Sequence, residues 1–325
     1  MAIVPQSLDG GRLDRVLTRL LGEVYSRSRL VRWIREGRVR VAGEVVVRAG
    51  SSVAAGQELE LELPPEQTAP IRPEQEPRIL HRDEWLAVLD KPSGLPMHGR
   101  FPGDRAPSVA RWLEERFGPG LPTFQGAERP GIVHRLDRET SGVCVVAFEA
   151  RAFADLQQQF AERTVEKEYR ALVYGRPRFR SDWIDKHLVR DPRHPERVRT
   201  TRATEGEGVR DALTYWEVVE RFDGFAHLRV QPRTGRTHQI RVHLASQGMP
   251  IMGDTLYRAR NFGPGMLPPG APAPGRTMLH ARTLRFEHPG GGGFVEFEAP
   301  LPEDMERLRA FLAAHAPARG PEGWA

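Results

Sequence analysis

One short segment carries charges of both signs between two apolar stretches: residues 131–142, with the sequence GIVHRLDRETSG. Its central carboxylate, Asp137, is flanked by Arg135 and Arg138. Neighbouring positive charge favours the ionised form of a carboxyl group, which is the form that a nucleophile or a general base must have. The segment therefore predicts a catalytic carboxylate at Asp137, although the same residues would also suit an ion-paired turn that leads into a strand.

A second basic segment, residues 233–243 with the sequence RTGRTHQIRVH, places three arginines around the expected start of a helix. We expect Thr237 to cap this helix, which would run through Ser246 and end at Gly248. The amide groups of a helix N-terminus favour anions, so the segment is suited to a carboxylate or a phosphate. Ordinary capping beside a solvated basic face is the structural alternative.

The sequence offers no recognisable cofactor or metal site. His238 and His243 are five residues apart and no HExxH pattern occurs, so neither histidine has the spacing of a metal ligand. A GxxxxGK phosphate loop is absent, and so is a GxGxxG sequence that opens a helix. We therefore expect a reaction that needs neither a metal ion nor an organic cofactor.

Four sequence blocks, in the same order, resemble the RluA-type pseudouridine synthases. The first segment above resembles their His-Arg-Leu-Asp and Arg-x-Thr-Ser-Gly motif, and the second resembles their Thr-Gly-Arg-Thr-His-Gln-Ile-Arg block. Residues 90–94 (DKPSG) and 167–175 (KEYRALVYG) resemble the strand-turn and Lys-x-Tyr blocks. The resemblance covers residues 79–312 and is highly specific because the blocks are collinear.

This resemblance implies that the protein converts uridine in RNA to pseudouridine. The N1–C1′ bond would break, the base would rotate, and C5 would bond to C1′. Reactant and product contain the same atoms, so no redox cofactor or activated donor is required. The target base must first leave its stack to be reached. Large-subunit ribosomal RNA is the expected substrate, and transfer RNA is the alternative.

The matched motifs also imply roles for single residues. Asp137 would be the catalytic carboxylate, acting either by covalent addition or by abstraction of a sugar proton. Tyr169 would pack against the flipped base, and Arg236 would pair with Asp137 to keep it ionised and oriented. Arg135 would fill the space that the flipped base leaves, with a phosphate contact as the alternative. Two further residues would line the substrate pocket: Leu279, which would also suit the core, and His238.

Residues 1–64 resemble the S4 RNA-binding domain, with two expected helices and several short strands. The second helix and the strand after it carry a run of arginines that few acids interrupt: Arg27, Arg29, Arg32, Arg35, Arg38 and Arg40. Such a patch supplies affinity for RNA phosphates that is independent of sequence and weakened by salt. A solvated charged face is the structural alternative.

The rest of the chain divides into a proline-rich linker, residues 65–78, a catalytic domain, residues 79–317, and a short tail, residues 318–325. Strands outnumber helices in the long domain and follow no regular βαβ order. We therefore predict an α+β fold, in which a mixed, largely antiparallel central sheet is flanked by helices and preceded by a small S4-like α+β domain.

Length and composition agree with two domains and a location outside the membrane. The chain has 325 residues, a formal net charge of +5 and 39% hydrophobic residues. No apolar run approaches the roughly 20 residues of a membrane helix, and no secretory signal is visible. Cys144 is the only cysteine, so an internal disulfide is impossible and a cytoplasmic location is expected. We expect a monomer that has RNA as its partner.

Two other classes of function fit parts of the pattern. A non-catalytic RNA-binding or ribosome-assembly protein would keep the fold but would have lost Asp137, Tyr169 or Arg236, and all three are present. A glycosidase-like hydrolase would need two carboxylates at a set separation. Asp137 and Glu139 would share one face of a strand, but the arginines and the tyrosine argue against that class.

Some residues beside the motifs depart from the pattern of the family. The tyrosine of a usual Thr-x-Tyr is displaced by one position in Thr214-Tyr215-Trp216, and Asp211 stands where a basic or neutral residue is commoner. Because these positions lie beside the catalytic motifs and not in them, we expect them to affect which RNA is bound more than the reaction itself.

Overall fold

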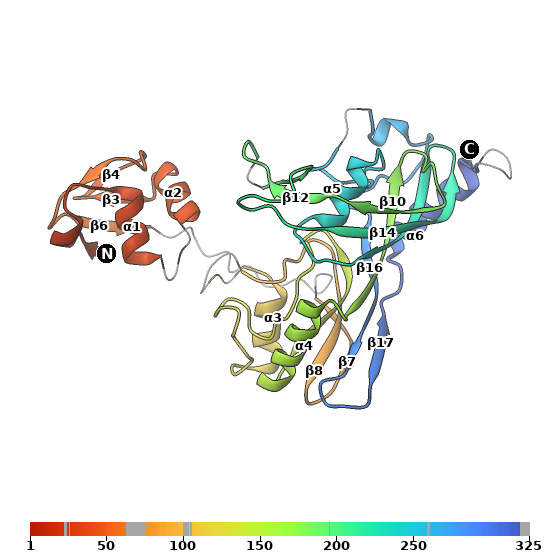
Figure 1. Ribbon diagram of the computed structural model, residues 1–325, viewed down its shortest axis with the longest axis horizontal. Coiled ribbons are helices and arrows are strands. Elements are labelled where there is room, and N and C mark those ends of the chain that lie inside the picture. The colour runs from red at the N-terminus through yellow and green to blue at the C-terminus, as the bar shows by residue number, and fades with distance from the viewer. Residues whose placement is uncertain are drawn as a thin grey trace. The chain divides into compact units, whose positions relative to one another are not determined.

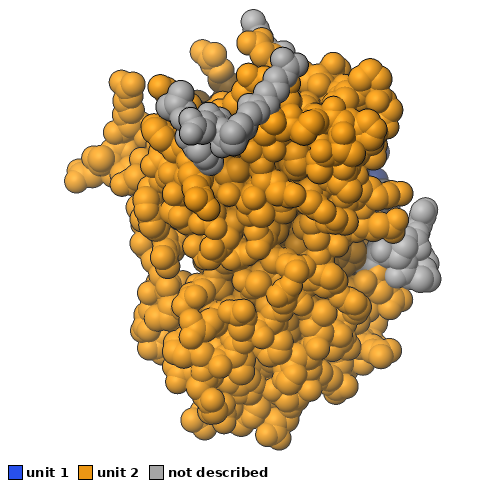
Figure 2. Space-filling model, turned by 90° about the vertical axis from the view of Figure 1, so that its right-hand side faces the viewer, with its two compact units in different colours: residues 1–69, 99–106 blue, residues 70–98, 107–325 orange. Residues whose placement is uncertain are grey.

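The structure is a computed structural model that describes residues 1–22, 25, 27–62, 76–99, 104, 106–194, 196–258 and 261–318, with only the backbone of Ser28. The chain separates into two compact units, coloured differently in Figure 2: unit 1 is residues 1–69 and 99–106, and unit 2 is residues 70–98 and 107–325. Most of the expected linker and nearly all of the expected tail lie outside the described residues. None of the described helices is long and apolar enough to span a membrane.

Unit 1 is built on two amphipathic helices that pack against small sheets (Figure 1). The apolar residues at helical spacing form its core, because Leu13 and Leu17 on the first helix meet Leu30 and Ile34 on the second. The sheets have the order β1-β6-β3-β4 and the pair β2-β5. The elements are β1 (Ala2–Ile3), the 3-10 helix η1 (Gln6–Leu8), β2 (Gly11–Arg12), α1 (Leu13–Leu21), α2 (Arg27–Arg35), β3 (Val39–Val41), β4 (Glu44–Val45), β5 (Ser52–Val53) and β6 (Glu58–Leu61).

Unit 2 is centred on a mixed sheet, which in the described part of the chain has nine strands in the order β11-β14-β15-β10-β16-β9-β8-β7, with β17 paired to β16. β16 runs parallel to β9, and the other pairs are antiparallel. This is the predicted α+β architecture. The strands are β7 (Arg78–Arg82), β8 (Leu86–Lys91), β9 (Ser141–Ala147), β10 (Glu166–Tyr174), β11 (Ser181–Asp185), β14 (Leu213–Phe222), β15 (Phe225–Pro232), β16 (Leu279–Glu287) and β17 (Phe294–Glu298), beside a hairpin of β12 (His187–Arg190) and β13 (Val198–Thr201).

The helices of unit 2 cover the sheet in two groups, each with its own hydrophobic core (Figure 1). They are α3 (Val109–Phe117), α4 (Ala150–Glu162), α5 (Gln239–Ser246), the 3-10 helix η3 (Pro264–Met266) and α6 (Glu303–His315). In the first core, Phe153 of α4 and Phe286 of β16 are fully buried with residues of α3, β8 and β9. In the second, Leu244 of α5 and Leu308 of α6 are buried against β10, β14 and β15. Tyr169 packs against both cores, so it lies at their junction.

The start of α5 differs from the prediction that Thr237 caps this helix. The N-cap is His238, which adopts a left-handed conformation with φ of 54°. The side-chain oxygen of Gln239 accepts the hydroxyl of Thr234 at 2.7 Å and the N–H of Arg236 at 3.0 Å. These bonds close a tight turn ahead of the helix, so the cap moves one residue along the chain.

Candidate active site

All six side chains that the sequence assigns to the site line one pocket of unit 2, with a volume of about 370 Å³. That volume lies within the usual range for sites that bind small ligands. The residues come from four parts of the chain: Arg135 and Asp137 from the loop before β9, Tyr169 from β10, Arg236 and His238 from the turn before α5, and Leu279 from β16. The fold therefore brings together segments that are far apart in the sequence.

A buried lysine, Lys91, donates hydrogen bonds to the backbone of the loop that carries Asp137. The ammonium group of Lys91 donates to the carbonyl oxygens of Leu95 and Arg138, at 2.8 and 3.2 Å. Ser93 Oγ donates to the carbonyl oxygen of Glu139 at 2.7 Å. Burial lowers the pKa of Lys91 to about 8. These bonds fix the backbone just after Asp137, so the loop is positioned before any ligand arrives.

Asp137 lies beside the guanidinium group of Arg241, which is buried. Asp137 Oδ2 is 3.4 Å from Arg241 Nη1. Arg241 is itself held by Asp254 through two hydrogen bonds, 2.7 Å from Nε to Oδ2 and 2.9 Å from Nη2 to Oδ1. Burial disfavours the charge of Asp254, but the bonds from Arg241 outweigh it and lower the pKa of that carboxyl group. This planar two-bond pair leaves the remaining edge of the guanidinium facing Asp137.

The predicted pair between Arg236 and Asp137 is therefore wrong. Arg236 donates to Asp211 instead, from Nη2 to a carboxylate oxygen at 2.6 Å and from Nε to the carbonyl oxygen at 3.0 Å. The other carboxylate oxygen of Asp211 accepts Arg163 Nη2 at 2.6 Å. Arg236 belongs to the turn before α5, whereas Arg241 lies in the first turn of the helix, on its buried side. Arg163 and Arg236 therefore form a basic rim of the pocket. Both arginines are positioned by their hydrogen bonds to Asp211.

His238 lies near the second carboxylate oxygen of the catalytic candidate. Its Nε2 is 4.0 Å from Asp137 Oδ1, which is too far for a hydrogen bond. Its Nδ1 is 3.0 Å from the hydroxyl of Tyr257, whose oxygen also accepts the N–H of Val198. Burial lowers the pKa of His238, although the charge of Asp137 opposes this shift. His238 is thus a neutral part of the pocket wall at neutral pH.

Tyr169 forms a rigid wall of the pocket. It lies on β10 where the pairing register with β16 shifts between Glu168 and Tyr169, so that Arg282 of β16 is left over as a β-bulge. Bulges often redirect side chains near active sites. Burial, together with the nearby charge of Asp137, raises the pKa of the Tyr169 hydroxyl well above its usual range. A neutral phenol ring packed against both cores is therefore available to contact a base.

The other predicted residues of this region have simpler surroundings. Leu279 is almost fully buried and also lines the pocket, so it belongs to both core and site. Arg135 is exposed at the rim. The neighbouring His134 accepts the N–H of Val145 at Nε2, at 3.0 Å, and stacks on Phe160. Burial lowers its pKa to about 3, so His134 is a packed, neutral histidine with no evident chemical role.

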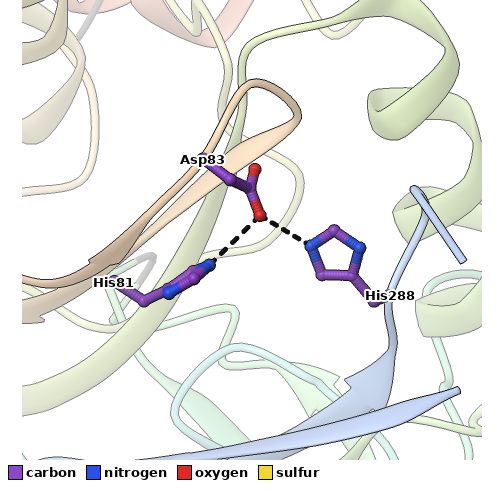
Figure 3. Close-up of side chains that lie close together, drawn as sticks. All are labelled: His81, Asp83 and His288. Atoms are coloured by element: carbon purple, nitrogen blue, oxygen red, sulfur yellow. Dashed lines mark hydrogen bonds and ion pairs between the residues drawn. The ribbon is translucent and has the colours of Figure 1, made fainter. Parts of the chain in front are cut away.

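One cluster among the described residues has the side chains of a metal site: His81, Asp83 and His288 (Figure 3). Nε2 of His81 and of His288 lie 3.1 and 2.8 Å from the same oxygen, Asp83 Oδ2. An ionised carboxylate only accepts, so both ring nitrogens carry protons. His288 Nδ1 accepts the N–H of Gly290 at 3.1 Å, which fixes that tautomer. A metal ion would need the Nε2 lone pairs, but these nitrogens donate to Asp83 instead. The cluster therefore joins the ends of the β7–β8 and β16–β17 hairpins by hydrogen bonds.

The arginines that were predicted to bind RNA lie on α2, on β3 and, for Arg38, between the two elements, and acids pair with more of them than the sequence suggests. Arg27 pairs with Asp14 at 2.7 Å, and Glu36 pairs with Arg32 and Arg38 at 2.8 and 3.3 Å. The other arginines are exposed or half-buried: Arg29, Arg35 and Arg40. The patch is therefore less positive than a count of arginines implies.

Comparison with known proteins identifies the family. A family model described as RNA pseudouridylate synthase matches residues 85–246, and one described as S4 domain matches residues 11–59. Ribosomal large subunit pseudouridine synthase D of Xanthomonas campestris pv. campestris is 37% identical over 320 residues, which cover 96% of this chain and 92% of that protein. The protein of the same name from Pseudomonas aeruginosa is 36% identical over 320 residues, with 96% and 95% covered.

A solved structure agrees with this comparison. Human RNA Pseudouridylate Synthase Domain Containing 4 superimposes with a TM-score of 0.55 and 26% identity, covering 71% of this chain and 92% of that chain. The matched family and the relatives identify an enzyme that acts on RNA and carries an S4 domain before its catalytic sheet in the sequence. The chain belongs to the RNA pseudouridine synthases, which convert uridine in RNA to its carbon-linked isomer.

Proposed function

We propose that the protein isomerises uridines of large-subunit ribosomal RNA, with Asp137 as the catalytic carboxylate. The names of the relatives support the substrate, because their similarity extends over more than nine-tenths of both chains. One observation carries the chemical part: Asp137 and Tyr169 line the same pocket, with Arg241 paired to Asp137. Transfer RNA is the alternative substrate.

In this mechanism the target uridine leaves its stack and its base packs against Tyr169. Asp137, which the contact with Arg241 orients, either adds covalently to the sugar or the base or abstracts a sugar proton. The N1–C1′ bond breaks, the base rotates, and C5 bonds to C1′. The proton that C5 loses corresponds to the proton that N1 gains, so the reaction balances without another reactant.

The remaining pocket residues hold the nucleotide in place. Arg135, which is exposed at the rim, fills the space that the flipped base leaves in the RNA. Arg236 acts at the rim with Arg163, where two guanidinium groups suit a phosphate of the RNA backbone. Leu279 and His238 supply an apolar wall and a neutral polar wall.

We further propose the domain limits that the sequence suggests. Residues 1–64 form an S4-like RNA-binding domain, residues 65–78 a linker, residues 79–317 the catalytic domain, and residues 318–325 a tail. The exposed arginines of α2 and β3 bind RNA phosphates without sequence preference. The match to the S4 domain at residues 11–59 supports this assignment.

The proposal is tested by mapping pseudouridines in total RNA from cells with and without the gene. Sites that disappear should lie in large-subunit ribosomal RNA and should return with the wild-type chain. Asp137→Asn should restore none of them, because the amide can neither add to carbon nor take up a proton. Glu139→Gln is the matched control: this acid is two residues away, does not line the pocket, and should restore every site. Sites that vanish from transfer RNA alone would instead favour the alternative substrate, and full rescue by Asp137→Asn would overturn the role of Asp137.

A further inference from the structure

Two aromatic rings, one exposed and one half-buried, lie at one edge of the sheet in unit 2. Trp183 is on the edge strand β11 and Tyr215 is on β14, and the register pairs them directly. Their ring centroids are 5.1 Å apart, with an angle of 53° between the planes. Trp183 is 45% exposed. A large ring left in solvent beside a second aromatic residue is a feature of surfaces that bind a partner.

Arg233 connects these rings to the pocket. Its guanidinium carbon lies 5.7 Å from the centre of the Trp183 ring, and the same residue lines the pocket. Arg233 is exposed, and no carboxylate in the described part of the chain forms an ion pair with it. Two rings and one uncompensated positive charge thus form a continuous surface that reaches the pocket wall.

The rings lie on the face of the sheet opposite to Tyr169. Trp216 and Tyr169 both pair with Val230 of β15, whereas Tyr215 pairs with the next residue, Gln231. Side chains alternate between the two faces of a sheet, so Tyr215 points away from the face that carries Tyr169. The surface therefore suits a part of the RNA that passes around the ends of the strands, and not the extruded uridine itself.

Two of the acids nearby are paired or face away from this surface. Glu217 accepts the tyrosine hydroxyl at 3.2 Å and is neutralised by Arg229, whose Nη1 is 3.0 Å away. Asp182 accepts the N–H of the following tryptophan and, by alternation, projects to the other face. Asp185, two residues after Trp183 on β11, is exposed and by the same alternation shares the face of the rings. The proposed contact with RNA therefore rests on the two rings and on Arg233, and not on a general positive charge around them.

We propose that Trp183, Tyr215 and Arg233 form a stacking site for an unpaired base that flanks the target uridine in the same RNA strand. Aromatic rings and arginine planes are the usual partners of unstacked bases in RNA. The inference rests on the proposed function and adds a second base site outside the catalytic pocket. This site selects the RNA and takes no part in the isomerisation.

Kinetics with a large-subunit ribosomal RNA transcript test this site. Trp183→Ala should raise KM by about 5- to 100-fold, the effect of removing one base stack, with kcat unchanged. Trp183→Phe should keep most of the affinity, and Trp183→Leu should behave like Trp183→Ala, because leucine keeps apolar area but has no ring. The matched control is Phe294→Ala: this phenyl ring is 55% exposed, lies 4.8 Å from the guanidinium carbon of Arg285, and does not line the pocket.

Two measurements separate the possible results. Stacking is nearly independent of salt, so the slope of affinity against salt should be the same for Trp183→Ala and the wild type, with folding checked by thermal unfolding. Affinity restored by leucine, or equal KM values for Trp183→Ala and Phe294→Ala, would overturn the proposal. Binding of a short oligouridine strand provides a readout that does not depend on the ribosomal substrate. If the wild type modifies no ribosomal RNA but Trp183→Ala still weakens oligouridine binding, then the proposed substrate fails and the stacking site stands.

Discussion

The carboxylate of Asp137 has a buried cationic neighbour, Arg241, which Asp254 holds through two hydrogen bonds. Arg236 stands five residues earlier and is engaged with Asp211 at the rim. The two arginines therefore differ in their surroundings: one is buried between two acids, and the other is half-buried at the pocket entrance. We therefore expect a change at Arg241 to affect the catalytic step more strongly than a change at Arg236.

Lysine replacements distinguish these two arginines. Arg241→Lys keeps the charge but cannot make the planar pair with Asp254 and reach Asp137 as well, so it should lower kcat by roughly 100-fold. Arg236→Lys, whose partner Asp211 is half exposed, should lower kcat by less than about 5-fold. Single-turnover formation of pseudouridine on saturating RNA measures both effects, and thermal unfolding checks the fold. A larger reduction for Arg236→Lys than for Arg241→Lys would favour Arg236 as the functional partner of Asp137.

At this scale, motifs in the sequence predicted the membership of the pocket but not the bonds inside it. All six predicted residues line one pocket. A motif shared with a family identifies the residues of a site, but it does not say which of them bond to one another. The choice between Arg236 and Arg241 depends on the turn closed by Gln239 and on the left-handed conformation of His238. Neither feature has a signal in residue type or spacing. Neutralisation of Arg27 likewise needs the tertiary contact with Asp14 on another helix.

Among the secondary-structure elements, the parallel pair of β9 and β16 positions the site most directly. β9 begins at Ser141, just after the loop that carries Asp137, and β16 begins at Leu279 on the pocket wall. The two strands meet where Gly142 pairs with Ala281. A Cβ atom on Gly142 would lie 2.1 Å from the carbonyl oxygen of Ala281, and the φ of Gly142 is +114°. Only glycine allows the backbones to approach this closely.

Gly142→Ala should therefore destabilise the fold by about 3 kcal/mol and reduce activity, because the strands that carry the two pocket walls must separate. The matched control is Gly224→Ala in the turn between β14 and β15, where φ is +87° and nothing lies within 4 Å of the added carbon. That change should cost only about 1 kcal/mol, from backbone strain alone. Urea unfolding measures both. Equal destabilisation of the two variants would show that the close approach at Gly142 is unimportant.

Elements with a clear periodic pattern were predicted well from the sequence. The helix expected to run through Ser246 is α5, which ends at that residue and begins one position later than expected. By contrast, α3 was not predicted, although Ser108 caps it and Val109, Trp112 and Leu113 have helical spacing. The hairpin β12–β13 was also missed. Its short strands carry mostly polar and charged residues, so no alternation of apolar and polar positions marks them.

At the scale of the whole molecule, the chain combines a small RNA-binding unit with a large catalytic one. In our proposal unit 1 supplies affinity through phosphate contacts, and unit 2 supplies the chemistry. The proline-rich composition of residues 65–78 and the arginines of α2 suggested this division from the sequence, and the exact limits stay a prediction. The sequence did not predict that acids of the same unit neutralise part of this charge.

Deleting residues 1–64 should weaken RNA binding and flatten its dependence on salt, by about 0.7 in the log–log slope for each phosphate of single-stranded RNA that is no longer neutralised. The rate at saturating RNA should be little changed, because the pocket lies within unit 2. In the full chain, a double variant Arg35→Glu, Arg40→Glu should reproduce part of the same change. Filter binding over a range of salt concentrations measures it, and an unchanged slope in both proteins would remove the role proposed for this patch.

The place of β16 near the end of the chain has a consequence for protein synthesis. This strand lies between β10 and β9, and its residues Leu279 and Phe286 belong to different cores of unit 2. Neither core is complete until the ribosome has released this last part of the chain. Unit 1, by contrast, is encoded almost wholly by the first fifth of the sequence. In our proposal, the part of a nascent chain that binds RNA is therefore complete long before the part that modifies a base.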